Sequence, residues 1–180
     1  MPLWLCLRFN ALPIEALLKK YSIEASIADV VIENHKVIAC DNLSSLNGVK
    51  TGQSLNTVKV LLKGQKVRFH KRDCEAERKT LDLIISWVYS LSPILQAWQN
   101  DALLIEIGCC LKLHGGLKNL LEHIKVEMTR RNLSVDIGVA QTKDAAYLLS
   151  FTDEFIGCHP EHNLIERLAI LPITLLDKEF

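Results

Sequence analysis

Few residues of this chain have the types and spacing that chemistry requires. The segment Cys158-His159-x-x-His162 carries metal-ligating types, but one thiol and two imidazoles in one loop leave a tetrahedral zinc site without its second half. His114 precedes Gly115-Gly116, where free amides of a helix start could bind an anion. A tight turn into the helix explains the two glycines more simply. Neither pattern predicts a site by itself.

The densest basic stretch covers residues 66–72. Lys66, Arg68, Lys71 and Arg72 could contact the phosphates of a DNA backbone, although a solvated face explains them nearly as well. The chain has 21 Lys and Arg against 21 Asp and Glu, so no net field draws it to a polyanion. We therefore expect any DNA contact to be weak and local.

Arg8 interrupts an otherwise apolar run in residues 3–9. The run is short and ends at Asn10, a pattern typical of a buried central strand. A charge on such a strand needs a partner.

The rest of the composition indicates an ordinary globular protein of the cytoplasm. Six cysteines stand without paired spacing, which is typical of free thiols in a reducing compartment. The apolar start lacks a basic region and a cleavage site of a signal peptide. No run approaches the ~18 apolar residues of a membrane span, so we predict no membrane association.

Periodicity and capping residues predict the elements that position these side chains. The predicted helices are residues 13–21, 55–62 after the cap Ser54, 74–91 after the cap Asp73, 117–130, and a helix capped by Thr142 that ends near residue 149. The predicted strands are residues 3–9, 27–32, 36–40, 66–69, 94–98, 102–107 and 135–139.

With an insert set aside, the order of elements is strand, helix, strand, strand, helix, strand. This is the α+β, ferredoxin-like βαββαβ pattern, with helices on one face of an antiparallel sheet. We predict that residues 1–10 and 73–150 form this domain, that residues 11–72 form a small α/β insert after the first strand, and that residues 151–180 form a helical tail.

This order resembles the palm and fingers of Y-family DNA polymerases of the UmuC/DinP type. Four segments carry the resemblance in sequence: Cys6-Leu7-Arg8 at the first acidic motif, Gly48-Val49-Lys50-Thr51-Gly52 in the fingers, residues 101–108 at the second palm motif, and Gly138-Val139-Ala140-Gln141-Thr142-Lys143 at the start of a phosphate-binding helix. Residues 3–9, 102–108 and 111–117 resemble more narrowly the ImuB branch, the accessory proteins of bacterial damage-induced mutagenesis.

The resemblance implies a degenerate metal site. The four acidic positions of the family fall on Cys6, Arg8, Asp101 and Ala102, so only Asp101 could bind a metal. Arg8, Asp101 and Lys143 together give this site a charge of about +1. In the family, four acids and the phosphate-contacting lysine give about −3. A cation near a like charge costs on the order of 1 to 4 kcal/mol. We therefore expect no catalytic residue and no cofactor, with Arg8 in the metal's place and paired with Asp101.

The nucleotide contacts implied by the resemblance are also reduced. Lys143 matches the lysine that contacts the triphosphate. The alternative, to which we give equal weight, is that Lys143 is an ordinary exposed lysine in the first turn of a helix. Asn42 and Ser45 stand where active relatives have a tyrosine and an arginine. The aromatic position that gates the sugar falls on Asn10 or Ala11.

The ImuB resemblance implies a non-catalytic scaffold in DNA repair, translesion synthesis and damage-induced (SOS) mutagenesis. Its partners would be DNA, a RecA-like protein, an error-prone polymerase and the sliding clamp, and the tail would be the start of a truncated thumb. Two alternatives stay open. One is an active nucleotidyltransferase with Mg²⁺ on Asp101 and Glu106, whose odd spacing on a strand places them on opposite faces unless a bulge intervenes. The other is a plain nucleotide- or DNA-binding module.

Overall fold

The computed structural model describes residues 2–19, 26–99, 101–152, 168–169 and 171. The chain divides into two compact units, of which unit 1 comprises Met1–Phe9 and Ile85–Phe180 and unit 2 comprises Asn10–Ile84. The Cys158-His159-x-x-His162 segment and nearly all of the predicted helical tail lie outside the described residues. The assignment of the units to a palm and fingers stays a prediction.

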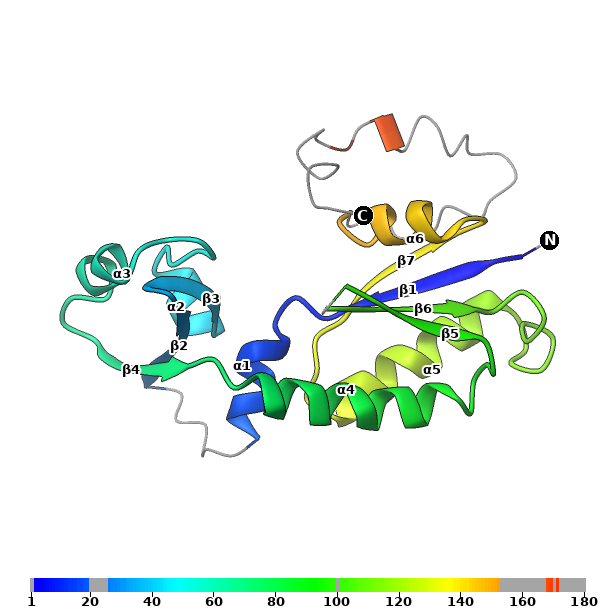
Figure 1. Ribbon diagram of the computed structural model, residues 1–180, viewed down its shortest axis with the longest axis horizontal. Coiled ribbons are helices and arrows are strands. Elements are labelled where there is room, and N and C mark those ends of the chain that lie inside the picture. The colour runs from blue at the N-terminus through cyan, green and yellow to red at the C-terminus, as the bar shows by residue number, and fades with distance from the viewer. Residues whose placement is uncertain (1, 20–25, 100, 153–167, 170, 172–180) are drawn as a thin grey trace. The chain divides into compact units, whose positions relative to one another are not determined.

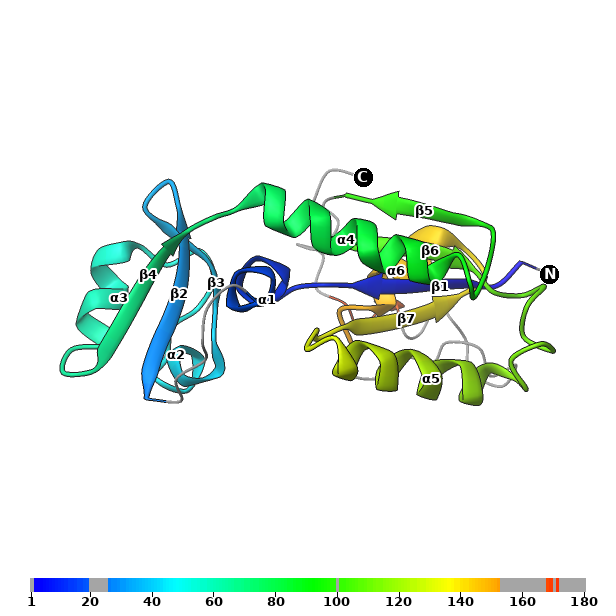
Figure 2. The ribbon, with the colours of Figure 1, turned by 90° about the horizontal axis from the view of Figure 1, so that it is seen from below.

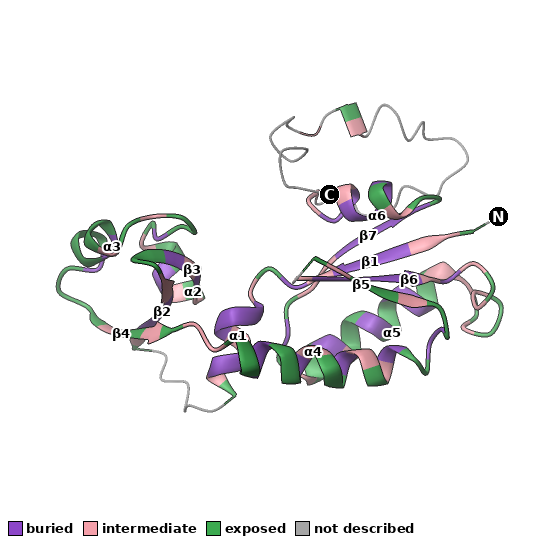
Figure 3. Ribbon diagram, viewed as in Figure 1, coloured by how far each residue is buried: buried purple, intermediate pink, exposed green. Residues whose placement is uncertain are grey.

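Unit 1 is built on a four-stranded antiparallel sheet with the order β5-β6-β1-β7. The strands are β1 (Trp4–Arg8), β5 (Leu95–Trp98), β6 (Ala102–Glu106) and β7 (Asp136–Ala140). β1 pairs antiparallel with both β6 and β7 (Figure 2). Its central position explains why an apolar run forms it, since Figure 3 shows β1 and β6 as largely buried. This order of elements confirms the predicted α+β, ferredoxin-like class.

The two faces of this sheet are covered by different helices. Figure 1 shows α5 (Leu117–Arg130) on one face and α6 (Lys143–Leu149) on the other. The buried stripe of α5 has the predicted helical spacing, with Leu120, Leu121, Ile124 and Met128. α6 follows the last strand of the βαββαβ pattern, so it is not one of the two helices whose common face was predicted.

Small residues allow α6 to lie close to the sheet. Ala145 and Ala146 of α6 pack with Cys6 and Ala102 in one buried cluster. At Gly138 a Cβ atom would lie 2.0 Å from the carbonyl oxygen of Ala146, a separation that no real Cβ atom adopts. The glycine is therefore required by the approach of the helix backbone to β7.

Unit 2 contains a three-stranded mixed sheet with the order β3-β2-β4. β2 (Ile27–Glu33) pairs antiparallel with β3 (Lys36–Cys40) and parallel with β4 (Lys66–Lys71). α1 (Leu12–Leu18) packs on Val31 and Ala39, whereas Val58 of α3 (Leu55–Leu61) packs on Val30 and Val37. Val30 and Val31 are neighbours on β2, so the two clusters lie on opposite faces of the sheet. A register shift between β2 and β3 explains why Val37 and Ala39, two residues apart on β3, belong to different clusters.

The local signals for helix starts were largely correct. Ser54, Asp73 and Thr142 accept hydrogen bonds from the amides three residues on, which confirms them as N-caps. α4 (Cys74–Val88) and the other predicted helices are present. The short helix α2 (Asn42–Leu46), capped by Asp41, was missed because five residues are too few for a periodic pattern. No helix among the described residues is long and apolar enough to span a membrane.

We expect Gly138→Ala to destabilise the protein by about 3 kcal/mol, because the added methyl group forces α6 away from β7. Urea unfolding of the variant measures this loss. Gly64→Ala is the control, since its φ of +91° strains any side chain but no atom lies within 4 Å, and we expect it to cost about 1 to 2 kcal/mol. Equal losses in both variants would contradict the close approach of α6.

Candidate functional site

The residues expected at the degenerate metal site come together in unit 1. In the register of β1 and β6, Arg8 stands directly opposite Ala102. The amide of Phe9 donates to the carbonyl oxygen of Asp101 at 2.7 Å, which brings that residue beside the end of β1. Cys6 lies on the same face of β1 as Arg8, and the charges of Arg8 and Asp101 both act on its thiol.

Cys6 is fully buried beneath α6. Burial raises the pKa of its thiol to about 12, and neither a hydrogen bond with Ser150 nor the positive charge of Arg8 reverses this shift. The thiol is therefore protonated at neutral pH. A protonated, buried thiol is neither a nucleophile nor a metal ligand.

Arg8 is held by contacts with three residues at the end of β1. Its Nη2 donates to Asp136 Oδ2 at 2.5 Å and to the carbonyl oxygen of Ser150 at 3.1 Å, and its Nε donates to Ser150 Oγ at 3.2 Å. The guanidinium carbon lies 4.0 Å from the ring centroid of Phe151, a cation–π distance. The side chain is only 11% exposed, so the buried charge has both a counter-ion and hydrogen-bond acceptors.

The salt-bridge partner of Arg8 is Asp136 and not the predicted Asp101. Asp136 begins β7 and stands opposite Arg8 in the antiparallel register, where cross-strand side chains of opposite charge meet. The sequence contained the signal, an acidic residue at the start of a predicted strand. The pairing of Asp136 with Arg8 could not be predicted without the order of the strands, which places β7 beside β1.

These residues do not fit the Mg²⁺ site that the resemblance implies for active members of the family. Mg²⁺ needs several oxygen ligands in near-octahedral geometry. The side chain of Ala102 has no ligand atom, Cys6 is a buried thiol, and Arg8 is itself a cation. Among the described residues, no group of three or more His, Cys, Asp or Glu side chains is arranged to hold a metal ion.

Glu106 stabilises the loop after β6 by hydrogen bonds and lies far from Asp101. It ends β6 while Asp101 directly precedes the strand, so the two are about 17 Å apart at the usual rise per residue. Its carboxylate accepts hydrogen bonds from the amides of Leu3 and Gly108 and from the thiol of Cys109. Burial opposes ionisation, but these hydrogen bonds outweigh it and hold the pKa of Glu106 below its usual value. This separation counts against a metal shared by the two carboxylates.

Lys143 is the first residue of α6 and is engaged within unit 1. Its Nζ donates to Gln96 Oε1 at 2.7 Å and lies 4.6 Å from the ring centroid of Trp4. Trp4 begins β1 and Arg8 ends it, so these two positions are about 13 Å apart along the strand. A contact between Lys143 and a triphosphate stays a prediction, and it would have to compete with both neighbours.

The other predicted nucleotide contacts lie in unit 2. Asn42 and Ser45 are exposed on α2, and a spacing of three residues places them on one side of that helix. Asn10 is exposed and Ala11 is half-buried just before α1. Their roles stay predictions.

His114 and the glycines after it form the tight turn that the simpler interpretation predicted. Gly115 and Gly116 both have positive φ, at 71° and 98°, which glycine adopts without strain. The Nε2 atom of His114 lies 3.1 Å from the carbonyl oxygen of Leu91.

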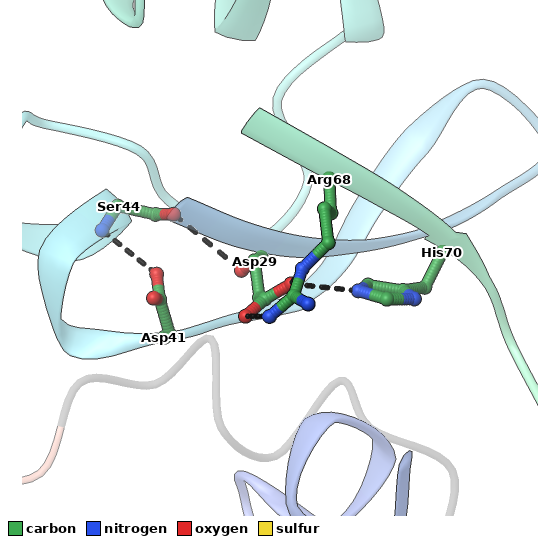
Figure 4. Close-up of polar contacts among 5 residues, drawn as sticks. All are labelled: Asp29, Asp41, Ser44, Arg68 and His70. Atoms are coloured by element: carbon green, nitrogen blue, oxygen red, sulfur yellow. Dashed lines mark hydrogen bonds and ion pairs between the residues drawn. The ribbon is translucent and has the colours of Figure 1, made fainter. Parts of the chain in front are cut away.

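The arginines of the basic stretch form ion pairs within unit 2. Arg68 binds Asp29 through two parallel hydrogen bonds of 2.8 and 2.9 Å, and His70 Nε2 lies 2.8 Å from the same carboxylate (Figure 4). All three point to one face of the sheet because Asp29 stands beside Arg68 in the parallel register. Bidentate pairing of this kind stabilises a carboxylate that is almost completely buried.

Arg72 is likewise paired with two carboxylates. Its Nε and Nη2 donate to Glu77 at 2.8 and 2.9 Å, and its Nη1 donates to Glu33 at 3.2 Å. Lys66 and Lys71 are exposed. DNA binding by this stretch stays a prediction, and the arginines contribute less positive potential than their number suggests.

We expect Cys6 to resist alkylation in the folded protein at mildly alkaline pH, because it is buried and its raised pKa leaves almost no thiolate. Peptide mapping by mass spectrometry after brief iodoacetamide treatment measures this. Cys74 is exposed and is the internal control that must be labelled. Equal labelling of both cysteines would show that α6 does not seal Cys6.

We expect Asp29→Asn to destabilise the protein by about 3 kcal/mol at neutral pH, since Arg68 and His70 lose a buried counter-ion. Burial opposes ionisation of Asp29, but the hydrogen bonds from both partners outweigh it and lower its pKa. The stabilisation is therefore present above about pH 4, the usual range of the group, and is lost as pH falls through the folded pKa.

Urea unfolding at several pH values measures this difference, which should shrink below about pH 4. The control Glu122→Gln changes an exposed carboxylate on α5 and should stay within about 0.5 kcal/mol of the parent. A difference for Asp29→Asn that does not depend on pH would contradict the role of the ionised carboxylate.

Solved structures of DNA polymerases share this fold. A ternary complex of the Dbh DNA polymerase has a TM-score of 0.66 at 17% identity, over 83% of this chain and 44% of that chain. An insertion ternary complex of Dbh has a TM-score of 0.66 at 15% identity, over 83% and 45%. A DinB-family error-prone DNA polymerase from Sulfolobus solfataricus has a TM-score of 0.64 at 14% identity, over 83% and 44%. This chain therefore spans less than half the length of these polymerases.

At these identities the likeness shows the fold alone. No curated protein sequence matches the chain significantly. The model of the impB/mucB/samB family matches residues 15–150, a range that begins after β1 and includes β2 to β7. Because this match covers well over half of the chain, the protein belongs to the impB/mucB/samB family and has the palm-type fold of Y-family DNA polymerases.

Proposed function

We propose that this protein is a non-catalytic member of its family that acts as a scaffold in DNA repair, translesion synthesis and damage-induced mutagenesis. The observation that carries the proposal is the guanidinium of Arg8, held by Asp136, Ser150 and Phe151 at a position where the resemblance places a metal-binding aspartate. A fixed positive charge takes the place of a metal ligand.

The energetics of this pair support the loss of chemistry. A metal at this end of β1 would have to separate Arg8 from Asp136, and breaking a buried ion pair costs about 3 to 5 kcal/mol. Asp136 is 39% exposed, so the lower end of that range applies. The ion would also lack the oxygen ligands that compensate for its lost hydration.

The role in DNA damage tolerance rests on membership of the family. Weak contact with DNA, and partners such as a RecA-like protein, an error-prone polymerase and the sliding clamp, belong to the proposal, as does placement in the ImuB branch. The ion pairs of Arg68 and Arg72 favour contacts with proteins over autonomous DNA binding.

We expect Mg²⁺ or Mn²⁺ with a deoxynucleoside triphosphate to leave the melting temperature of this protein unchanged, because a ligand that does not bind the folded state cannot stabilise it. Differential scanning fluorimetry measures the melting temperature, and a primer-extension assay run in parallel should show no product. The Dbh polymerase under the same conditions is the positive control.

A metal-dependent rise in melting temperature, or primer extension, would contradict the proposal and favour the active alternative. Asp101→Asn then tests whether the metal uses the one family-matching acid, with Asp144→Asn on the exposed first turn of α6 as its matched control. A rise with nucleotide alone, independent of metal, would instead favour a nucleotide-binding module.

A further inference from the structure

A concave surface of unit 2 lies between α3, β4 and the turn that joins β2 to β3. We name it the hairpin groove, and its volume is about 570 Å³. Its apolar lining includes Ile32, Leu55 and Phe69, and its basic lining includes His35, Lys59 and Lys71.

The groove follows from the spacing of these residues. Leu55 and Lys59 are four residues apart on α3 and therefore lie on one side of the helix. Phe69 and Lys71 are two residues apart on β4 and share one face of the strand. Arg68 occupies the other face, where it binds Asp29. The alternation of β4 thus keeps Arg68 out of the groove, whereas His70, the second partner of Asp29, reaches its lining.

The lining combines an exposed aromatic ring with several cations. Phe69 is 42% exposed, and an aromatic ring left partly in water gains when a partner covers it. Lys59, Lys71 and His35 are exposed. Within the part of the chain that the structure describes, no Asp or Glu lines the groove, so its potential is positive.

We propose that the hairpin groove binds a short acidic segment of a partner protein that carries an apolar anchor residue. The anchor packs against Phe69 and Leu55, as buried anchors do at the centre of protein interfaces. Carboxylates on either side of the anchor meet Lys59 and Lys71, which provides complementary charge at the rim.

A protein segment fits this surface better than a nucleic-acid strand. Strand binding uses a basic groove that follows many phosphates together with successive aromatic platforms. Here Arg68 and Arg72 are neutralised by Asp29, Glu33 and Glu77. The groove offers instead one aromatic ring, aliphatic neighbours and a few cations, which suits one anchor with flanking acids.

The inference extends the proposed scaffold role without depending on it. The groove lies in unit 2, whereas the degenerate metal site lies in unit 1. Loss of peptide binding would leave the metal titration unaffected, and a functional metal site would leave the groove unaffected. The two proposals can therefore fail separately.

The test selects a displayed library of random short peptides on the immobilised 180-residue chain and, in parallel, on a Lys59→Glu, Lys71→Glu double variant. A selected peptide is then synthesised with a fluorescent label, and its affinity is measured by anisotropy. Phe69→Ser removes the aromatic ring without a change of charge. Lys63→Glu is the matched control, because Lys63 is exposed and lies outside the groove lining.

We expect peptides rich in Asp and Glu around a Leu, Phe or Trp to be enriched on the parent chain. Charge reversal of both lysines should weaken binding by about tenfold or more, whereas Lys63→Glu should change it by less than about twofold. Phe69→Ser should weaken binding while the melting temperature stays close to that of the parent.

Three results would overturn the proposal. One is a selection that enriches no acidic, apolar peptides, and another is a selected peptide that binds the double variant as well as it binds the parent. The third comes from a labelled oligothymidylate: if this strand binds through Lys59, Lys71 and Phe69 and the peptides do not, the groove is a nucleic-acid site.

Discussion

The close approach of α6 to the sheet is the constraint on which the rest of unit 1 depends. It is possible because Gly138 has no side chain and because Ala145 and Ala146 face the strands. The same approach buries Cys6 and raises the pKa of its thiol. It also brings Ser150, at the end of α6, to the guanidinium of Arg8. One packing contact therefore forms an apolar layer that ends at the guanidinium of Arg8, at the position where the resemblance places metal ligands.

The charges in both units are largely used to hold the fold. Arg8 with Asp136 and Arg68 with Asp29 each join neighbouring strands of one sheet, and both pairs contain a side chain that is mostly removed from water. Pairs of this kind tolerate the loss of neither partner. This internal use of charge agrees with a chain of zero net charge, and it leaves the hairpin groove, with Lys59 and Lys71, as a distinct positive surface of unit 2.

Family membership and the proposed loss of chemistry rest on different residues of this protein. The family match begins at residue 15, and Cys6 and Arg8 precede it on the central strand. A fold can persist when its site is lost, because the packing that defines the fold is spread over many residues, whereas metal binding depends on a few carboxylates. Here Asp101 alone matches those carboxylates, and Glu106 stabilises a loop at the far end of its strand.

The sequence by itself determined the strands, the α+β class, and the helices and N-caps other than α2 and its cap Asp41, because these depend on periodicity and on hydrogen bonds between near neighbours. It also indicated that Arg8 needed a counter-ion. Only the tertiary structure decided that Asp136 is this counter-ion, that α6 covers a face of the sheet, and that Asp29 neutralises Arg68. Each of these contacts joins residues that are far apart in the chain. Strand order and register bring them together, and no local sequence pattern encodes either.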